Sequence, residues 1–305
     1  MSNNIWFIGT GKFAALCLEN LIRKNIPLHR IITSLPTRSG RNNRENPSAV
    51  ELAASVLGLN VERTGRLSDN QQLIHELADD DPAIIFVIDF GQIVREPFLS
   101  RMCLNIHPSL LPEYRGAAPV QRALLEGRAF TGVSVFRLAK AMDAGEVFGQ
   151  VRTEILPDEN ASDLYKRLAE MGCEIAAEAL KNPYALTFTP QDESLATYAP
   201  KLGKADFELL FSMPAKKFTD SVRALDMSGG AFTVIRGKRV KIWRAVMLED
   251  IKAKIHGQIL ECSGNPVVSC EDFGVELAEV QSEGKNRVTG SEWMRGLRLK
   301  CGDIL

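Results

Sequence analysis

Apolar and polar positions follow two alternating patterns in the first half of the chain. Short apolar runs predict buried strands at residues 5–8, 28–33, 60–63, 83–88 and 103–107. Helical spacing of apolar side chains predicts helices at residues 12–24, 48–57, 69–78, 118–126 and 161–180. Residues 131–137 and 147–153 are also β-like. Strands that alternate with helices predict an α/β fold with a Rossmann-like, mostly parallel sheet.

The pattern changes near residue 182. Prolines and polar residues dominate residues 182–204, which indicates a linker. A helix is predicted at 214–223, and short β-like runs follow at residues 231–235, 240–245, 257–260, 266–269 and 275–280. Short strands separated by glycine-marked turns predict a small, OB-like β-barrel. We therefore expect a first domain at residues 1–188, a linker at 189–205 and a barrel domain at 206–305.

Composition limits the classes of protein to which this chain can belong. The chain has 305 residues, of which 45% are hydrophobic and 25% charged, as in soluble globular proteins. The net charge of −1 excludes a protein that coats nucleic acid non-specifically but leaves room for a local basic patch. Six cysteines show neither CxxC nor zinc spacing, so we expect free thiols in a reducing compartment and no metal site. Without a membrane-spanning run or a signal peptide, the expected location is the cytoplasm.

The most informative polar residues lie at the end of the strand at 103–107. Asn105 and His107 are two residues apart, so both side chains point to the same side of the strand. Pro108 and Pro112 then end regular structure. A neutral His can accept a proton near pH 7, and an Asn amide can donate to a carbonyl oxygen that gains negative charge. The pair suits attack of an amine or water on a carbonyl carbon.

Asp143, in a turn-like Met-Asp-Ala-Gly segment, is the expected third partner. Its carboxylate would orient His107 and favour the protonated ring. Two structural alternatives remain open at this point. His107 fits a hydrogen-bonded structural residue, and Asp143 fits a simple turn former.

Residues 9–14, Gly-Thr-Gly-Lys-Phe-Ala, support a different hypothesis. A G-x-G-x-x-A pattern between a strand and a helix is the context of a dinucleotide fingerprint. The acidic residue expected about 20 residues later is missing, because the second strand ends in Ile-Ile-Thr-Ser. Arg38 is available for a 2′-phosphate, so an NADP-dependent oxidoreductase stays open as the alternative.

Several motifs resemble the formyltransferases that use 10-formyltetrahydrofolate. They are the run at residues 105–112, Arg-Gly-Ala-Ala-Pro at 115–119, Thr-Gly-Val at 131–133 and Asp-Ala-Gly at 143–145. The resemblance covers nearly the whole chain. The resemblance implies that Asn105 stabilises an oxyanion, His107 accepts or relays a proton, and Asp143 holds His107. It also implies a folate site formed by Ser109, Leu110, Leu111 and Pro112, with the pterin against Ile88, Asp89, Phe90 and Gly91.

The acceptor substrate is a separate question, because the same trio serves methionyl-tRNA, a glycinamide ribonucleotide and amino sugars in this family. The resemblance is greatest to members that act on methionyl-initiator tRNA. It implies contacts with the acceptor stem from Arg38, Arg41, Arg44, Lys238, Arg239 and Lys241. We expect a monomer without membrane association. An amino-sugar N-formyltransferase and a non-catalytic tRNA- or folate-binding protein remain alternatives.

The basic segment at residues 236–244 is β-like. Its alternation predicts Arg236, Lys238 and Val240 on one face and Arg239, Lys241 and Trp243 on the other. Cations beside an aromatic ring suit phosphates and a stacked base. A solvated strand edge is the competing interpretation.

The chain departs from the family's pattern in three places. Gly11 stands where the family usually has Pro, and Asp89-Phe90-Gly91 replaces the usual Ala-Tyr-Gly. The loop at residues 41–45 is less basic than the family's lysine-rich version.

Overall fold

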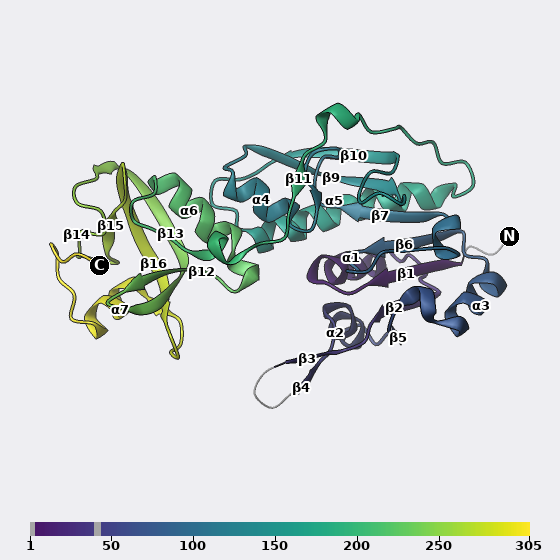
Figure 1. Cartoon of the computed structure of the whole chain (residues 1–305), viewed down its shortest axis with the longest axis horizontal. Helices are drawn as coiled ribbons and strands as arrows, with labels where there is room; N and C mark the ends of the chain where they lie inside the picture. Colours follow the sequence, from purple (N-terminus) through teal and green to yellow (C-terminus); the bar gives the residue numbers. More distant parts are fainter. Residues whose placement is uncertain (1–3, 40–43) are drawn as a thin grey trace. The chain divides into compact units, whose positions relative to one another are not determined.

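The computed structural model describes residues 4–39 and 44–305, without the side chains of residues 38, 39 and 44 (Figure 1). Contacts within the chain group it into two compact units. The first comprises Met1–Pro119, Phe130–Glu154 and Tyr165–Ala199, and the second comprises Val120–Ala129, Ile155–Leu164 and Pro200–Leu305.

A seven-stranded sheet forms the centre of the first unit, in the order β10-β9-β7-β6-β1-β2-β5. Its parallel strands are β1 (Ile5–Gly9), β2 (Arg30–Ser34), β5 (Glu62–Thr64), β6 (Ile84–Ile88) and β7 (Cys103–His107). The antiparallel strands β9 (Phe130–Arg137) and β10 (Val147–Glu154) complete one edge. The predicted α/β fold is confirmed. The strand order reverses between β1 and β6, which is where open α/β sheets bind ligands.

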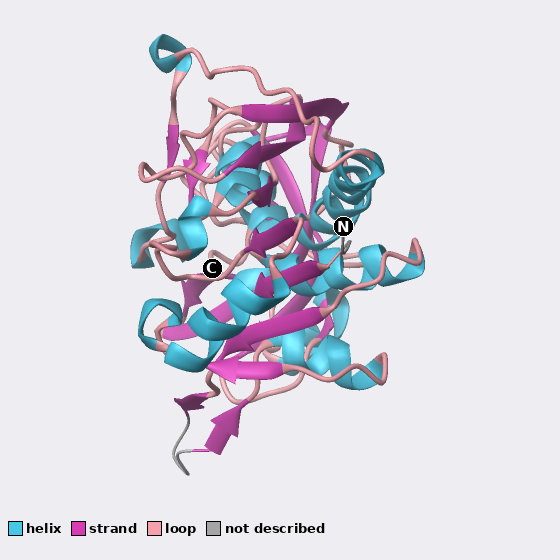
Figure 2. Ribbon diagram, turned by 90° about the vertical axis from the view of Figure 1, so that its right-hand side faces the viewer, coloured by secondary structure: helices cyan, strands magenta, loops and turns pink. Residues whose placement is uncertain are grey.

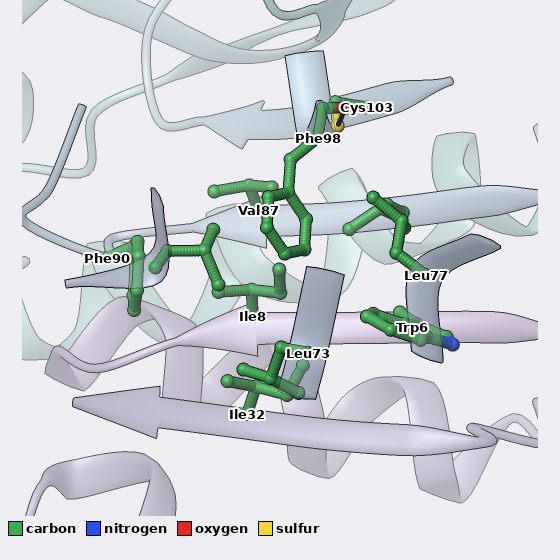
Figure 3. Packing of buried hydrophobic residues seen from close by; sticks show 11 residues of the cluster. Trp6, Ile8, Ile32, Leu73, Leu77, Val87, Phe90, Phe98 and Cys103 are labelled. Carbon is green, nitrogen blue, oxygen red and sulfur yellow. Dashed lines mark hydrogen bonds between the residues drawn. The ribbon is translucent and has the colours of Figure 1, made fainter. Parts of the chain in front are cut away.

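Helices lie on both sides of these strands (Figure 2). Their bounds are α1 (Lys12–Arg23), α2 (Ala49–Val56), α3 (Gln71–Asp80) and α5 (Ala161–Lys181). All of α4 (Pro119–Leu125) except its first residue belongs to the second unit. One face of the sheet packs against α3, in an apolar cluster that includes Trp6, Ile8, Val87, Leu73, Leu77 and Phe98 (Figure 3). Every residue of β1 and β6 is buried, as expected for strands covered on both faces.

Short elements connect the larger ones. The hairpin of β3 (Thr37–Ser39) and β4 (Arg44–Asn46) follows β2 and precedes α2. The segment predicted as a linker contributes β11 (Tyr198–Ala199), which pairs in parallel with β8 (Arg115–Gly116) inside the first unit. Single 3-10 turns lie at Leu67–Asp69, Phe98–Ser100, Glu193–Leu195, Lys204–Phe207 and Asp226–Ser228.

The second unit contains an antiparallel six-stranded sheet in the order β12-β13-β16-β15-β14, with β17 paired to β16. The strands are β12 (Ala231–Ile235), β13 (Lys238–Lys252), β14 (Ile259–Glu261), β15 (Val267–Ser269), β16 (Phe273–Ser282) and β17 (Val288–Thr289). Two helices accompany them, α6 (Ala215–Ala224) and the unpredicted α7 (Gly290–Gly296). Arg236 lies in the turn between β12 and β13 with φ 51°, so its predicted place on the ribbon was wrong.

The expectation of six free thiols was also wrong, because Cys262 and Cys301 form a disulfide. The chain end returns to β14: the N–H of Ile259 donates to the carbonyl of Asp303, and the N–H of Gly302 donates to the carbonyl of Ile259, both at 2.9 Å. This pairing brings together cysteines that are 39 residues apart in sequence. The other four cysteines are free and buried.

The described part of the chain contains no helix that is long and apolar enough to cross a membrane. It also contains no cluster of three or more His, Cys, Asp or Glu side chains arranged to hold a metal ion.

Candidate active site

A cavity of about 420 Å³ opens in the first unit beside the carboxyl ends of β6 and β7. This volume lies within the range of small-molecule sites, about 300–1,000 Å³. The residues that line it include Asp89, Phe90, Gly91, Asn105, His107 and Asp143. The structure therefore brings the three predicted catalytic side chains to one cavity, together with part of the predicted folate site.

The ring of His107 is held at one nitrogen and open at the other. Its Nε2 lies 2.9 Å from the carbonyl oxygen of Tyr114. Because a carbonyl oxygen only accepts, we assign the proton to Nε2, which leaves Nδ1 as the basic nitrogen of the neutral ring. Nδ1 lies 3.8 Å from Oδ2 of Asp143, and both side chains are largely buried. A proton taken up at Nδ1 would be stabilised by the carboxylate on one side and the carbonyl on the other.

The backbone fixes the position of Asp143. This residue has φ 50°, in the left-handed region that non-glycine residues seldom occupy. Its Oδ2 accepts a hydrogen bond from the N–H of Gly116 at 2.8 Å. Gly145 is required in the same turn, since a Cβ there would lie 1.7 Å from the carbonyl oxygen of Arg137. The carboxylate is thus held beside His107 by a turn with little freedom.

Asn105 lies two residues before His107 on β7, as the alternation predicted. It is partly exposed to solvent and lines the same cavity. Its side-chain amide is therefore available to a bound molecule, while His107 and Asp143 form the less accessible part of the wall.

The loop after β7 is anchored away from the cavity. Ser109 Oγ donates to the carbonyl of Glu113, and the Ser109 carbonyl accepts from Ser134 Oγ, both at 2.6 Å. Leu111 donates its N–H to Ser134 Oγ and accepts from Gln150 Nε2. The described residues that line the cavity do not include Ile88, Ser109, Leu110, Leu111 or Pro112. Their contact with folate stays a prediction.

Asp89 places a carboxylate at the N-terminus of α1. Its Oδ2 accepts from the N–H of Phe13 at 3.3 Å, and its carbonyl accepts from the N–H groups of Thr10 and Gly11. Solvent reaches Asp89 through the cavity, although protein atoms surround the carboxyl group on most sides. This burial raises its pKa to about 6, and hydrogen bonds from Phe13 and Ala14 act in the opposite direction.

The same arrangement argues against the dinucleotide alternative. A bound pyrophosphate would need the N–H groups at the start of α1, where helix dipole and free donors favour an anion. The carboxylate of Asp89 already occupies this position. The sequence signal for this role was an acidic residue directly after a fully buried strand.

In the second unit, cations and aromatic rings alternate on β12 and β13. The Arg239 guanidinium lies 4.3 Å from the ring centroid of Phe232, and Lys241 Nζ lies 5.4 Å from that of Trp243. Arg287 also stacks on Trp243, at 3.3 Å. Sequence reasoning missed Arg287 because it follows β16 and is far from Trp243 along the chain. Lys238 is exposed at the start of β13.

The other predicted cations cannot be placed in the same way. Arg41 lies outside the described residues, as do the side chains of Arg38 and Arg44. The backbones of Arg38 and Arg44 pair across the β3–β4 hairpin with Glu45 and Ser39, respectively.

Similarity to known proteins extends along nearly the whole chain. The family model for formyl transferase matches residues 3–180, and that for the formyl transferase C-terminal domain matches residues 201–298. The chain is 33% identical over 311 residues to a methionyl-tRNA formyltransferase of Caldicellulosiruptor saccharolyticus, covering 99% of each protein.

Two solved structures share the fold. One is a methionyl-tRNA formyltransferase from Clostridium thermocellum, with a TM-score of 0.58 and 16% identity, over 81% of this chain and 94% of that one. The other is HypX from Aquifex aeolicus in complex with tetrahydrofolic acid, with a TM-score of 0.66 and 17% identity, over 100% of this chain and 49% of that one.

Proposed function

Because the chain belongs to the formyltransferase family, we propose that it transfers the formyl group of 10-formyltetrahydrofolate to the α-amine of methionyl-initiator tRNA. The observation that carries this proposal is the single cavity lined by Asn105, His107 and Asp143. Its supporting context is similarity to a methionyl-tRNA formyltransferase along both units.

The first step is attack by the neutral amine on the formyl carbon. An α-amino group has a pKa of about 8, so a useful fraction is neutral at physiological pH. Attack forms a carbon–nitrogen bond and leaves negative charge on the formyl oxygen. The amide of Asn105 donates to this oxygen, a role that contributes about 3 kcal/mol in comparable sites.

The attacking nitrogen must then lose a proton. Nδ1 of His107 accepts it, since Nε2 is engaged with the Tyr114 carbonyl. Asp143 stabilises the resulting imidazolium. The bond from the formyl carbon to folate N10 breaks, and the proton passes to N10. The products are formylmethionyl-tRNA and tetrahydrofolate.

The donor and the acceptor use different surfaces in this proposal. The pterin lies against Asp89, Phe90 and Gly91 in the cavity, and the HypX complex shows that a protein of this fold binds tetrahydrofolic acid. The acceptor stem contacts Lys238, Arg239 and Lys241 of the second unit, together with Arg38, Arg41 and Arg44. The enzyme acts as a monomer in the cytoplasm.

A direct assay tests the function. Purified protein is incubated with 10-formyltetrahydrofolate and charged initiator tRNA, and formylmethionine is scored after hydrolysis. His107→Ala should lower kcat by about 100-fold or more, because general acid–base catalysis contributes about 10²–10⁴. His75→Ala is the matched control, since His75 is exposed on α3 and pairs with Asp79 along its own helix. Wild-type protein that forms no formylmethionine, or full activity of His107→Ala, would contradict the proposal.

A further inference from the structure

A segment predicted to be a linker is bonded into the first unit. We call residues 189–199 the strap. The carbonyl of Thr197 accepts from the N–H of Arg115 at 2.9 Å, and Thr197 Oγ1 accepts from the N–H of Tyr114 at 2.8 Å. β11, at the end of the strap, pairs with β8. The strap therefore supports the backbone that follows His107.

The side-chain amide of Gln191 uses all of its hydrogen-bonding capacity within this region. Its Nε2 donates to the carbonyls of Asp143 and Gly145, at 2.8 and 2.7 Å. Its Oε1 accepts from Nε and Nη2 of Arg115, at 3.1 and 2.8 Å. Only an amide nitrogen can donate to two carbonyls, and only an amide oxygen can accept from a guanidinium, so the orientation is unambiguous.

Arg115 makes this arrangement rigid. Its side chain is 2% exposed and bonds Glu193 of the strap through Nη1 and Nη2, at 2.9 and 2.7 Å. Planar, two-pronged contacts of a guanidinium with a carboxylate fix geometry better than a single bond. Arg115 therefore fixes the Oε1 atom of Gln191, and the Nε2 atom of the same amide holds the 143–145 turn.

Both proposed proton-handling groups are linked to the strap. Asp143 has a left-handed backbone whose carbonyl is bonded to Gln191. His107 donates to the carbonyl of Tyr114, whose N–H donates to Thr197. Strained backbone of this kind persists only where its surroundings hold it. Loss of the Gln191 amide would remove both donors from the turn and let the carboxylate move away from Nδ1.

We propose that Gln191 is a positioning residue for formyl transfer, which holds the Asp143 carboxylate at His107 without contacting either substrate. The described residues that line the cavity do not include Gln191. The inference rests on the proposed function for its kinetic consequences. The geometry at His107, however, can be measured without turnover.

Gln191→Met tests the proposal, because Met has similar length but cannot donate or accept in the same way. We expect kcat to fall about ten- to hundredfold, as small misplacements of catalytic groups do, with KM for both substrates within about twofold. In an Asp143→Asn background the same substitution should cost nothing further.

Asp192→Ala is the control within the strap. The Asp192 carboxylate accepts from the N–H and hydroxyl of Ser194, so its loss removes a local contact of the strap and leaves both Gln191 donors to the 143–145 turn in place. Wild-type kinetics are expected. An equal loss of kcat in Asp192→Ala, or a wild-type kcat in Gln191→Met, would overturn the positioning role. Thermal unfolding curves of each variant verify that the proteins are folded.

Imidazole ¹⁵N NMR separates the two proposals. The chain has four histidines, so the His107 resonances can be assigned by substitution. Gln191→Met should shift the Nδ1 resonance of His107, and Asp192→Ala should not. An unchanged resonance overturns the positioning role alone. If Gln191→Met shifts the resonance but the wild-type protein transfers no formyl group, the positioning of His107 is supported and the proposed function alone is overturned.

Discussion

The backbone of Gly11 lies so close to the Asp89 carboxylate that a methyl group added at Gly11 should displace the carboxylate. A Cβ built on Gly11 would lie 1.9 Å from Oδ2 of Asp89, closer than non-bonded atoms come. Gly11→Ala must therefore push the carboxylate from the start of α1, where it accepts from the N–H of Phe13. Family members usually carry Pro and Ala at these two positions, and the two departures amount to one physical change.

The expected magnitude follows from three contributions. A hydrogen bond to a charged group contributes about 1.5–3 kcal/mol, but the 3.3 Å distance and solvent access reduce this to about 1 kcal/mol. Loss of the anion at the helix N-terminus costs about 0.5 kcal/mol. The effect of Ala itself is close to zero, because Ala restricts the unfolded chain by about 0.5 kcal/mol but is disfavoured relative to Gly by a similar amount at the N-cap of α1, which Gly11 occupies. Gly11→Ala should therefore lower the free energy of unfolding by about 1.5 kcal/mol.

In an Asp89→Gly background the cost should disappear. No carboxylate obstructs the methyl group there, and the restriction of the unfolded chain by Ala offsets its cost at the N-cap, so Gly11→Ala should leave the free energy of unfolding nearly unchanged. The assay is urea unfolding followed by Trp6 fluorescence, with Trp243 and Trp293 replaced by Phe so that the first unit alone is observed. An equal cost of Gly11→Ala in both backgrounds would show that the coupling does not exist.

Two more predictions concern the second unit. Arg122 lowers the pKa of Asp206 through hydrogen bonds of 2.8 and 2.9 Å. The pair therefore stabilises the folded state at pH values above about 4, the pKa of Asp in the unfolded chain. This stabilisation is lost as the pH falls through the lower pKa that Asp206 has in the folded protein. Asp206→Asn should lower the free energy of unfolding by about 1 kcal/mol or less at pH 7 and should not change it in strong acid. A loss of stability that persists in strong acid would show that it does not come from the Arg122–Asp206 ion pair. Lys241→Ala should raise KM for tRNA, leave KM for folate unchanged and reduce the salt slope of tRNA binding by about one. Equal effects on both substrates would remove Lys241 from the tRNA surface.

The local pattern of apolar and polar residues predicted the strand that holds two of the proposed catalytic side chains. β7 has the bounds expected from its apolar run, Cys103–His107, and its alternation placed Asn105 and His107 on one side. Such predictions succeed because strand periodicity and the burial of parallel strands depend on neighbouring residues. The approach of Asp143 to His107 followed from chemistry, because a basic ring needs a partner, and not from periodicity.

Partners that are distant in sequence were not predictable in this way. Cys301 meets Cys262 only because the chain end pairs with β14, and Arg287 meets Trp243 only because β13 and β16 are neighbours in the sheet. The pairing of β8 with β11 involves two residues on each side, too few for a pattern. Each of these contacts depends on the completed fold.

The strap shows why composition is a poor guide to where a functional unit ends. Prolines and polar residues marked residues 189–205 as a linker, yet the first compact unit extends to Ala199. Polar side chains indicate a linker only when water satisfies them. Here Gln191 satisfies two carbonyls beside a left-handed residue, a requirement that an apolar side chain could not meet. The polarity of Gln191 therefore reflects the backbone groups of the Asp143 turn, and this residue lies in the sequence well after the three side chains proposed to perform the chemistry.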